Sequence, residues 1–169
     1  MKKTMLFLFG FGDTFCDTKS HRCIKRGLEL VNQSLELLAN PKYNFYGVVR
    51  VNEPSDTFNT IDIGKHVNPN RLIDVKLCAN SLFSNNNQIS IPGSGGDTIL
   101  DGNQLDFVIS PEDFNISIAG IDINGIFINS IDELIDRGFS VNVFSNIIKP
   151  FTKSTIDSIK KSKARFGKS

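Results

Sequence analysis

Asn115-Ile-Ser-Ile-Ala-Gly120 opens the stretch of sequence that determines the fold. A short segment with isoleucine at every second position that ends at a glycine is typical of a strand. Apolar residues then recur at helical spacing over residues 123–137, Gly138 ends this helix, and Phe139-Ser-Val-Asn-Val-Phe144 follows as the next strand. A strand, a helix and a second strand within about 30 residues form a βαβ unit, in which the two strands run parallel. The C-terminal third therefore predicts an α/β fold.

Elements of the same kind are expected before and after this unit. Met5-Leu-Phe-Leu-Phe9 fits a strand buried on both faces of a parallel sheet, and Phe45-Tyr-Gly-Val-Val-Arg-Val51 fits a second one. Helical spacing of apolar residues predicts helices over residues 21–38 and 153–165. The sequence thus predicts a single Rossmann-like domain over residues 1–169. Its layers would be α/β/α, around a central, mostly parallel sheet of about five or six strands.

The middle of the chain, residues 52–102, is rich in turn signals such as Asn-Pro-Asn at 68–70 and Pro-Gly-Ser-Gly-Gly at 92–96. Short strands are expected at residues 74–77 and 88–91, with loops between them. A loop-rich excursion is often where a domain binds its ligand, although plain surface loops are the more common explanation.

The composition argues against several classes of protein. The formal net charge is +1, which gives no global attraction to nucleic acid or to an anionic membrane. No segment reaches the roughly 20 apolar residues of a bilayer span, and the N-terminal apolar run leads into Asp13 rather than into a small-residue cleavage site. We therefore expect no membrane segment and no signal peptide.

The cysteines and the amino-acid composition suggest where such a protein occurs. Cys16, Cys23 and Cys78 form no CxxC pair, which favours reduced thiols in the cytoplasm. The two histidines, His21 and His66, offer little for a metal site. Ile, Asn, Lys and Phe are abundant, as in the proteins of AT-rich bacteria or of their viruses.

Three local features could indicate catalysis or ligand binding, and each has a more common explanation. Cys16 lies near Asp13, Asp17 and His21 in sequence, as a catalytic thiol would, but an idle cysteine is the usual case. The glycine-rich segment at 92–98 lacks the Gly-Lys-Ser/Thr ending of a nucleotide-binding loop. The basic residues near the C-terminus are more typical of a solvated helix face than of a nucleic-acid site; these are Lys160, Lys161, Lys163, Arg165 and Lys168.

Two segments resemble the isochorismatase-like cysteine hydrolases, a family that includes the nicotinamidases. In that family a strand ends in Gly, a Thr-Asp pair follows, and the nucleophilic Cys opens a helix. Gly-Tyr-x-Val, a strand and an Asp-Ala pair come next. Comparable spacing is found here for Gly120, Asn124, Gly138, Phe139, Val141 and Asn146. Leu6-Phe-Leu-Phe9, a turn and Phe15 are similar to the family's first strand and its Asp-Phe ending.

The catalytic residues of the family are missing at the matching positions. Gly10 stands where the resemblance places the general base, an Asp, and Ile126 stands where it places the nucleophilic Cys. The lysine that completes the triad would fall near Ile91-Pro92-Gly93, and the metal-binding Asp-x-His has no match in Val51-Asn-Glu-Pro54. Nucleophilic catalysis needs a nucleophile, a base and an orienting or charge-stabilising partner. The resemblance therefore implies a pseudoenzyme without a metal or another cofactor.

Such a protein is expected to act by binding a small molecule or a protein partner, in a pocket at the carboxyl ends of the strands. Family members are commonly oligomeric, so the resemblance also implies a homo-oligomer, whereas a nucleic-acid or membrane partner is not expected. An active hydrolase with a displaced nucleophile, Cys16 or Ser94, and a purely structural scaffold remain the alternatives. The residues expected nearest the pocket are Gly10, Asp13, Asn52, Ser94, Asn124 and Ile126.

Overall fold

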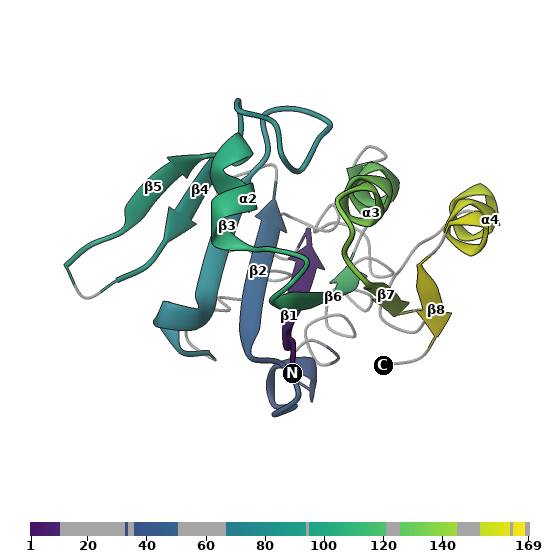
Figure 1. Cartoon of the computed structure of the whole chain (residues 1–169), viewed down its shortest axis with the longest axis horizontal. Coiled ribbons are helices and arrows are strands. Elements are labelled where there is room, and N and C mark those ends of the chain that lie inside the picture. Colours follow the sequence, from purple (N-terminus) through teal and green to yellow (C-terminus); the bar gives the residue numbers. More distant parts are fainter. Residues whose placement is uncertain are drawn as a thin grey trace, which may run out of the picture.

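The computed structural model describes residues 1–10, 33, 36–50, 67–93, 95–120, 126–144, 153–162 and 164–167. The described strands form one eight-stranded sheet in the order β5-β4-β3-β2-β1-β6-β7-β8 (Figure 1). The strands are β1 (Lys3–Phe9), β2 (Phe45–Arg50), β3 (Leu72–Lys76), β4 (Gln88–Ile91), β5 (Thr98–Asp101), β6 (Phe114–Gly120), β7 (Val141–Phe144) and β8 (Arg165–Gly167). The helices are η2 (Pro69–Arg71), η3 (Gly102–Gln104), α2 (Leu105–Val108), α3 (Ile126–Asp136) and α4 (Lys153–Lys161).

The parallel pair of β1 and β6 forms the centre of the sheet. Lys3 pairs with Phe114 at one end, and Phe9 pairs with Gly120 at the other. Both strands are nearly unbroken apolar runs because both of their faces are covered, so that Leu6, Phe7 and Leu8 are all fully buried. β2 lies parallel to β1 on its other side. The prediction of buried parallel strands in these two parts of the chain is confirmed.

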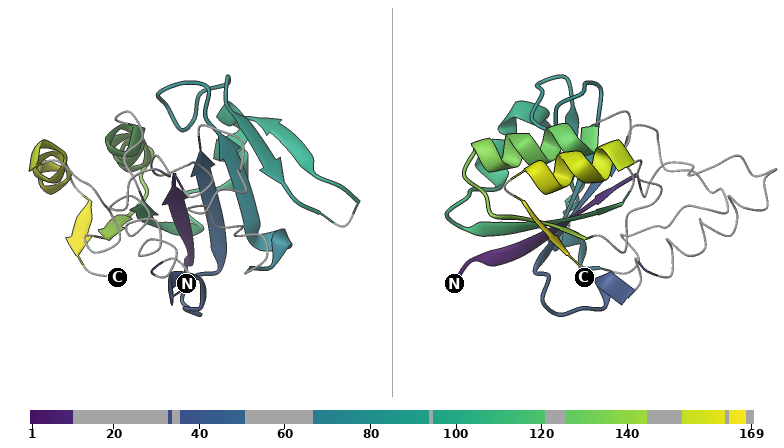
Figure 2. Two further views of the ribbon diagram at one scale, coloured as in Figure 1. Left: turned by 180° about the vertical axis from the view of Figure 1, so that it is seen from behind. Right: turned by 90° about the vertical axis from the view of Figure 1, so that its right-hand side faces the viewer.

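α3 and α4 cover one face of the sheet (Figure 2). Side chains alternate along a strand, and Phe7 and Phe9 therefore point toward this face while Leu6 and Leu8 point away from it. Phe127, Ile131 and Leu134 of α3 and Ile159 of α4 belong to the core on this face. Each such side chain stabilises the fold by about 1.5–3 kcal/mol when it is fully buried. None of the helices among the described residues is long and apolar enough to cross a bilayer.

The opposite face has a smaller core. Leu6 and Leu8 pack there with Leu37, Leu38 and Tyr43. The helix predicted over residues 21–38 lies mostly outside the described residues, but Leu38, the last residue of its expected apolar face, is buried. The α/β fold class that the sequence predicts is confirmed.

Tyr43 should make stability fall at high pH. Its ring packs edge-on against Phe144, with 6.3 Å between the ring centroids, and burial raises its pKa from 10.0 to about 12. The unfolded chain therefore loses this proton before the folded one does, so the free energy of unfolding declines as the pH rises from about 10 to about 12. We expect Tyr43→Phe to remove this decline, which is on the order of 1–2 kcal/mol. Urea unfolding at several pH values would measure it, and equal pH dependence in both proteins would contradict the expectation.

The sheet is larger than predicted and is mixed, because β4 and β5 form an antiparallel hairpin on β3. The strands predicted at residues 74–77 and 88–91 exist, as β3 and β4. β5 was not predicted. A glycine-rich turn precedes it and most of its side chains are exposed, so it carries no alternation of apolar and polar residues. The expectation of about five or six strands was therefore too low.

The last predicted helix ends earlier than expected. α4 stops at Lys161, where the Ser162 hydroxyl donates to the Ile159 carbonyl at 2.6 Å and accepts from the Ala164 N–H at 3.2 Å. Arg165, which was predicted to lie in the helix, opens β8 instead. A serine that bonds to nearby backbone groups competes with the helix for them, which explains the early end.

Candidate functional site

Parallel strands bring their carboxyl ends together at one edge of the sheet. β1 ends at Phe9, β2 at Arg50, β3 at Lys76 and β6 at Gly120. The chain continues from β1 to β2 on one side, while β6 lies on the other side of β1. Open α/β sheets bind ligands at such a change of direction, outside the carboxyl ends of the strands. This carboxyl edge is the candidate site.

Gly10 is the first residue after β1. Its φ is 81°, in the left-handed region that favours glycine, and its N–H donates to the Val49 carbonyl at 2.8 Å. The backbone is thus fixed between two strands at the position where the resemblance expects an aspartate base. Glycine has no side chain to accept a proton there.

Ile126 is the first residue of α3, and only 3 % of its surface is exposed. The next residue, Phe127, packs edge-on against Phe9, with 5.2 Å between the ring centroids. The start of α3 therefore lies against the end of β1. Because a buried isoleucine side chain has no nucleophilic atom, it cannot form a thioester.

Four of the six predicted pocket residues lie outside the described residues: Asp13, Asn52, Ser94 and Asn124. The same holds for Cys16, the candidate displaced nucleophile, and for Cys23. Cys78 is described, and it is an exposed free thiol.

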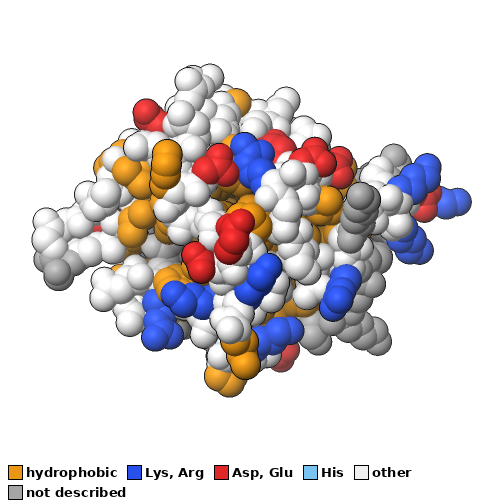
Figure 3. Space-filling view, in the orientation of Figure 1, with side chains coloured by type: hydrophobic (Ala, Val, Ile, Leu, Met, Phe, Trp, Pro, Cys, Tyr) orange, Lys and Arg blue, Asp and Glu red, His pale blue; other side chains and the backbone are white. Residues whose placement is uncertain are grey.

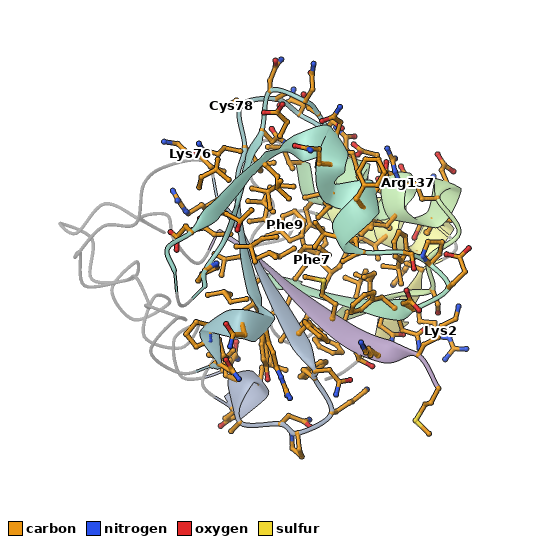
Figure 4. All side chains as sticks on the ribbon, turned by 60° about the vertical axis from the view of Figure 1, so that its left-hand side comes forward. Lys2, Phe7, Phe9, Lys76, Cys78 and Arg137 are labelled. Carbon is orange, nitrogen blue, oxygen red and sulfur yellow. The ribbon has the colours of Figure 1, made fainter. Side chains whose placement is uncertain are left out.

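A lysine at the carboxyl edge was missed by the sequence reasoning. Lys76 is the last residue of β3 and is half-buried, and Figure 4 shows it near the tip of the strand with Cys78 just beyond it. The lysine of the family had been sought near Ile91-Pro92-Gly93. That segment follows an antiparallel strand in which Ser90 pairs with Asp74, so it lies toward the opposite edge of the sheet. Sequence spacing does not reveal such a reversal of direction.

Lys76 has charged neighbours on the same face of the sheet. Arg50 of β2 pairs with Lys76 in the strand register, and its Nε donates to both carboxylate oxygens of Asp74, at 2.9 and 3.1 Å. The side chain of Arg50 is only 10 % exposed, so this ion pair is protected from solvent and fixes the guanidinium. The ends of β2 and β3 thus carry two cations and one carboxylate.

The segment after β3, residues 77–87, connects this edge to α3 through side-chain contacts. Ser81 donates from its hydroxyl to Glu133 at 2.9 Å, and the Asn129 amide donates to the Asn80 carbonyl at 3.2 Å. The Arg137 guanidinium lies 3.6 Å from the Phe83 ring centroid. These contacts hold α3, and with it Ile126, in a fixed position relative to the end of β3.

The described residues include no group of three His, Cys, Asp or Glu side chains that could hold a metal ion. The segment after β2, where the resemblance places Asp-x-His, reads Val51-Asn-Glu in the sequence. A valine in place of the aspartate, next to the Arg50 cation, is a poor donor set for a divalent cation.

No protein-family model and no curated protein sequence matches this chain. Solved structures do match its fold. The yeast nicotinamidase Pnc1p, solved with the inhibitor nicotinaldehyde, is similar at a TM-score of 0.63 and 11 % identity, over 98 % of this chain and 100 % of that one. An isochorismatase-like hydrolase from Alkaliphilus metalliredigens has a TM-score of 0.62 and 10 % identity, over 99 % and 94 %.

A third similar structure is N-carbamoylsarcosine amidase from Thermoplasma acidophilum, with a TM-score of 0.60 and 9 % identity, over 99 % of this chain and 96 % of that one. Identities this low establish a likeness of fold and nothing finer. The likeness extends over nearly the whole of each of these chains. The chain has the fold of the isochorismatase-like hydrolases.

Proposed function

We propose that this protein binds a small molecule or a protein partner at the carboxyl edge of its sheet and does not carry out the acyl transfer of the hydrolases whose fold it has. The observation that carries the proposal is Ile126. It opens α3, where the resemblance places the nucleophile, and it is buried in the core. Gly10 leaves the position of the base without a side chain. A site without nucleophile and base keeps its ability to bind.

Lys76 suggests which ligands such a site would favour. It is half-buried at the end of β3, next to the Arg50–Asp74 ion pair. A lysine ammonium in a partly desolvated position attracts carboxylates and polarised carbonyl oxygens. A small carboxylic acid or amide therefore fits this corner better than a cationic or purely apolar ligand.

A thermal-shift series tests the proposal. Nicotinamide, nicotinate, isochorismate-like acids, NAD-type nucleotides and cyclic dinucleotides would each be added to the purified protein. A ligand at about 100 times its Kd stabilises the folded state by about 2.7 kcal/mol, which raises the Tm by several degrees in a chain of this size. We expect such a shift with one carboxylate or amide class, and we expect Lys76→Met to remove it.

Lys2→Met is the matched control. Lys2 lies at the amino end of β1, where its Nζ donates to the Pro111 carbonyl, and so it carries the same charge at the opposite edge. A shift that survives Lys76→Met would contradict the assignment of Lys76, and no shift with any class would favour a protein partner or a scaffold. Hydrolysis of an amide substrate that is lost in Cys16→Ala or Ser94→Ala would overturn the proposal in favour of a displaced nucleophile.

A further inference from the structure

Charge is strongly segregated along this chain although its formal net charge is only +1. Residues 77–136 contain nine acidic side chains and no Lys or Arg, whereas residues 137–169 contain eight Lys or Arg and one Asp. The nine acidic residues are Asp97, Asp101, Asp106, Glu112, Asp113, Asp122, Asp132, Glu133 and Asp136. Such an asymmetry favours association between unlike ends of two molecules.

The two charged segments supply the two outermost described strands of the sheet. β5 comes from the acidic segment and β8 from the basic one, and they lie at opposite ends of the molecule in Figure 1. The outer edge of such a strand carries backbone N–H and C=O groups that can pair with another strand. Of the nine acidic residues, Asp97 and Asp101 lie at β5, whereas Asp132, Glu133 and Asp136 lie on α3. The two outermost described strands, with the charges beside them, are thus placed where two copies would meet.

The β5 edge is short and ends in the charged Asp101, but other protections against pairing are missing from it. It has no lysine, proline or bulge, and its side chains are mostly exposed. Ile99 is 53 % exposed, which is high for a large apolar side chain in a strand. Asp97 and Asp101 flank Ile99 and Leu100 on either side. The edge therefore presents an apolar centre between two carboxylates.

The opposite edge has the complementary charge. Lys153, Lys160 and Lys161 of α4 and Arg165 of β8 are all exposed, with Asp157 as the single acidic residue of α4. Figure 3 shows several Lys and Arg side chains at the end of the molecule where Figure 1 places α4. This end would repel a second basic edge and attract the β5 edge.

The strand directions also fit. β5 is antiparallel to β4, which is antiparallel to β3, so β5 runs in the same direction as β3 and as the parallel strands up to β8. If β5 of one copy lay beside β8 of the next, the sheet would continue with a parallel pair in the sense of its central strands. If two β5 strands instead paired antiparallel about Ile99, Asp97 of one copy would lie opposite Asp101 of the other. Like charges directly opposite each other destabilise such a pair.

We propose that two copies of this chain associate head to tail, with the β5 edge of one against the α4–β8 edge of the next. This inference goes beyond the proposed function and does not depend on it. In a head-to-tail contact each copy keeps one edge free for a further copy, unless the rotation between successive copies closes them into a ring. The assemblies therefore become larger as the protein concentration rises, and they do not stop at a dimer. It also weakens with salt, because exposed charges attract over only about 10 Å at 0.1 M ionic strength.

Sedimentation velocity over a concentration series, in about 20 mM and about 500 mM salt, tests this directly. We expect the wild-type protein to associate at low salt and to dissociate at high salt. Asp97→Lys/Asp101→Lys should weaken the association at least about tenfold, and Lys160→Glu/Lys161→Glu should do the same. Mixing the two variants should restore it, since each then offers the charge that the other has lost.

Glu36→Lys/Glu112→Lys is the control, because it makes the same change in net charge at two exposed residues away from β5. Ile99→Lys gives a second test that leaves both carboxylates in place, and it should also weaken the contact. Circular dichroism would show that each variant is folded. A wild-type protein that stays monomeric at low salt, a closed dimer, or association that both charge reversals leave intact would each overturn the proposal.

Discussion

We expect Gly120→Ala to lower the free energy of unfolding by at least about 4 kcal/mol, a large part of the roughly 5–15 kcal/mol of a typical domain. Gly120 ends β6 with a φ of 120°, and a Cβ there would lie 2.1 Å from the Phe9 carbonyl oxygen. The positive φ costs about 1–3 kcal/mol. Relief of the backbone clash requires β1 and β6 to move apart, which disrupts the central pair of the sheet. Urea unfolding would measure the loss, since the midpoint follows stability when the slope is unchanged.

Gly96→Ala separates the two causes. Gly96 has a similar φ of 112°, but no atom lies within 4 Å of the position where its Cβ would stand. Gly96→Ala should therefore lower the free energy of unfolding only by the conformational cost of the positive φ, about 1–3 kcal/mol. Equal losses in the two variants would show that the close approach of β1 and β6 is unimportant.

The central part of the fold follows from the sequence because its signals are local. Met5–Phe9 is an unbroken apolar run, which is typical of a strand buried on both faces, and residues 115–120 end a shorter Ile-containing segment at a glycine. The same reasoning placed α3 within residues 123–137, where apolar side chains recur at helical spacing. The structure has both strands and the helix where the pattern places them.

The outer strands of the sheet depend on contacts that no local sequence pattern reveals. β5 carries two exposed side chains at its start and owes its place to pairing with β4. The hairpin also reverses the chain, which is why Ile91-Pro92-Gly93 lies away from the carboxyl edge and why Lys76 was overlooked. Arg165 was placed in a helix because a basic run resembles a solvated helix face. It lies instead in a short strand that pairs with Asn142.

Part of the candidate site could likewise be predicted from the sequence, and part of it could not. The resemblance identified Gly10 and Ile126, and both prove to be set in rigid surroundings, one by a backbone hydrogen bond to β2 and the other by burial in the core. A rigid edge suits binding, because a preorganised surface loses less entropy when a ligand binds. Lys76 could be found only from the order and direction of the strands.

The loop that links Lys76 to α3 should depend on Asn87. Its side chain is almost fully buried. Its Nδ2 donates to the Ser81 carbonyl at 2.6 Å and to the Leu82 carbonyl at 3.1 Å, and its Oδ1 accepts from the Cys78 N–H at 2.9 Å. We expect Asn87→Ala to cost about 3 kcal/mol, because one donor and two acceptors lose their partner inside the protein. Urea unfolding would measure the loss, and hydrogen exchange at the Cys78 amide would become faster.

Asn86→Ala provides the comparison, since Asn86 is exposed and its backbone N–H, which the substitution keeps, donates to the Ser84 hydroxyl. That substitution should stay within about 0.5 kcal/mol of the wild type. In Asn87→Ala the Ser81–Glu133 bond would also lose its anchor, so the α3 side of the carboxyl edge should loosen together with the loop. A ligand that binds beside Lys76 should then produce a smaller thermal shift in Asn87→Ala than in Asn86→Ala. Equal shifts would mean that the loop holds the fold together without shaping the site.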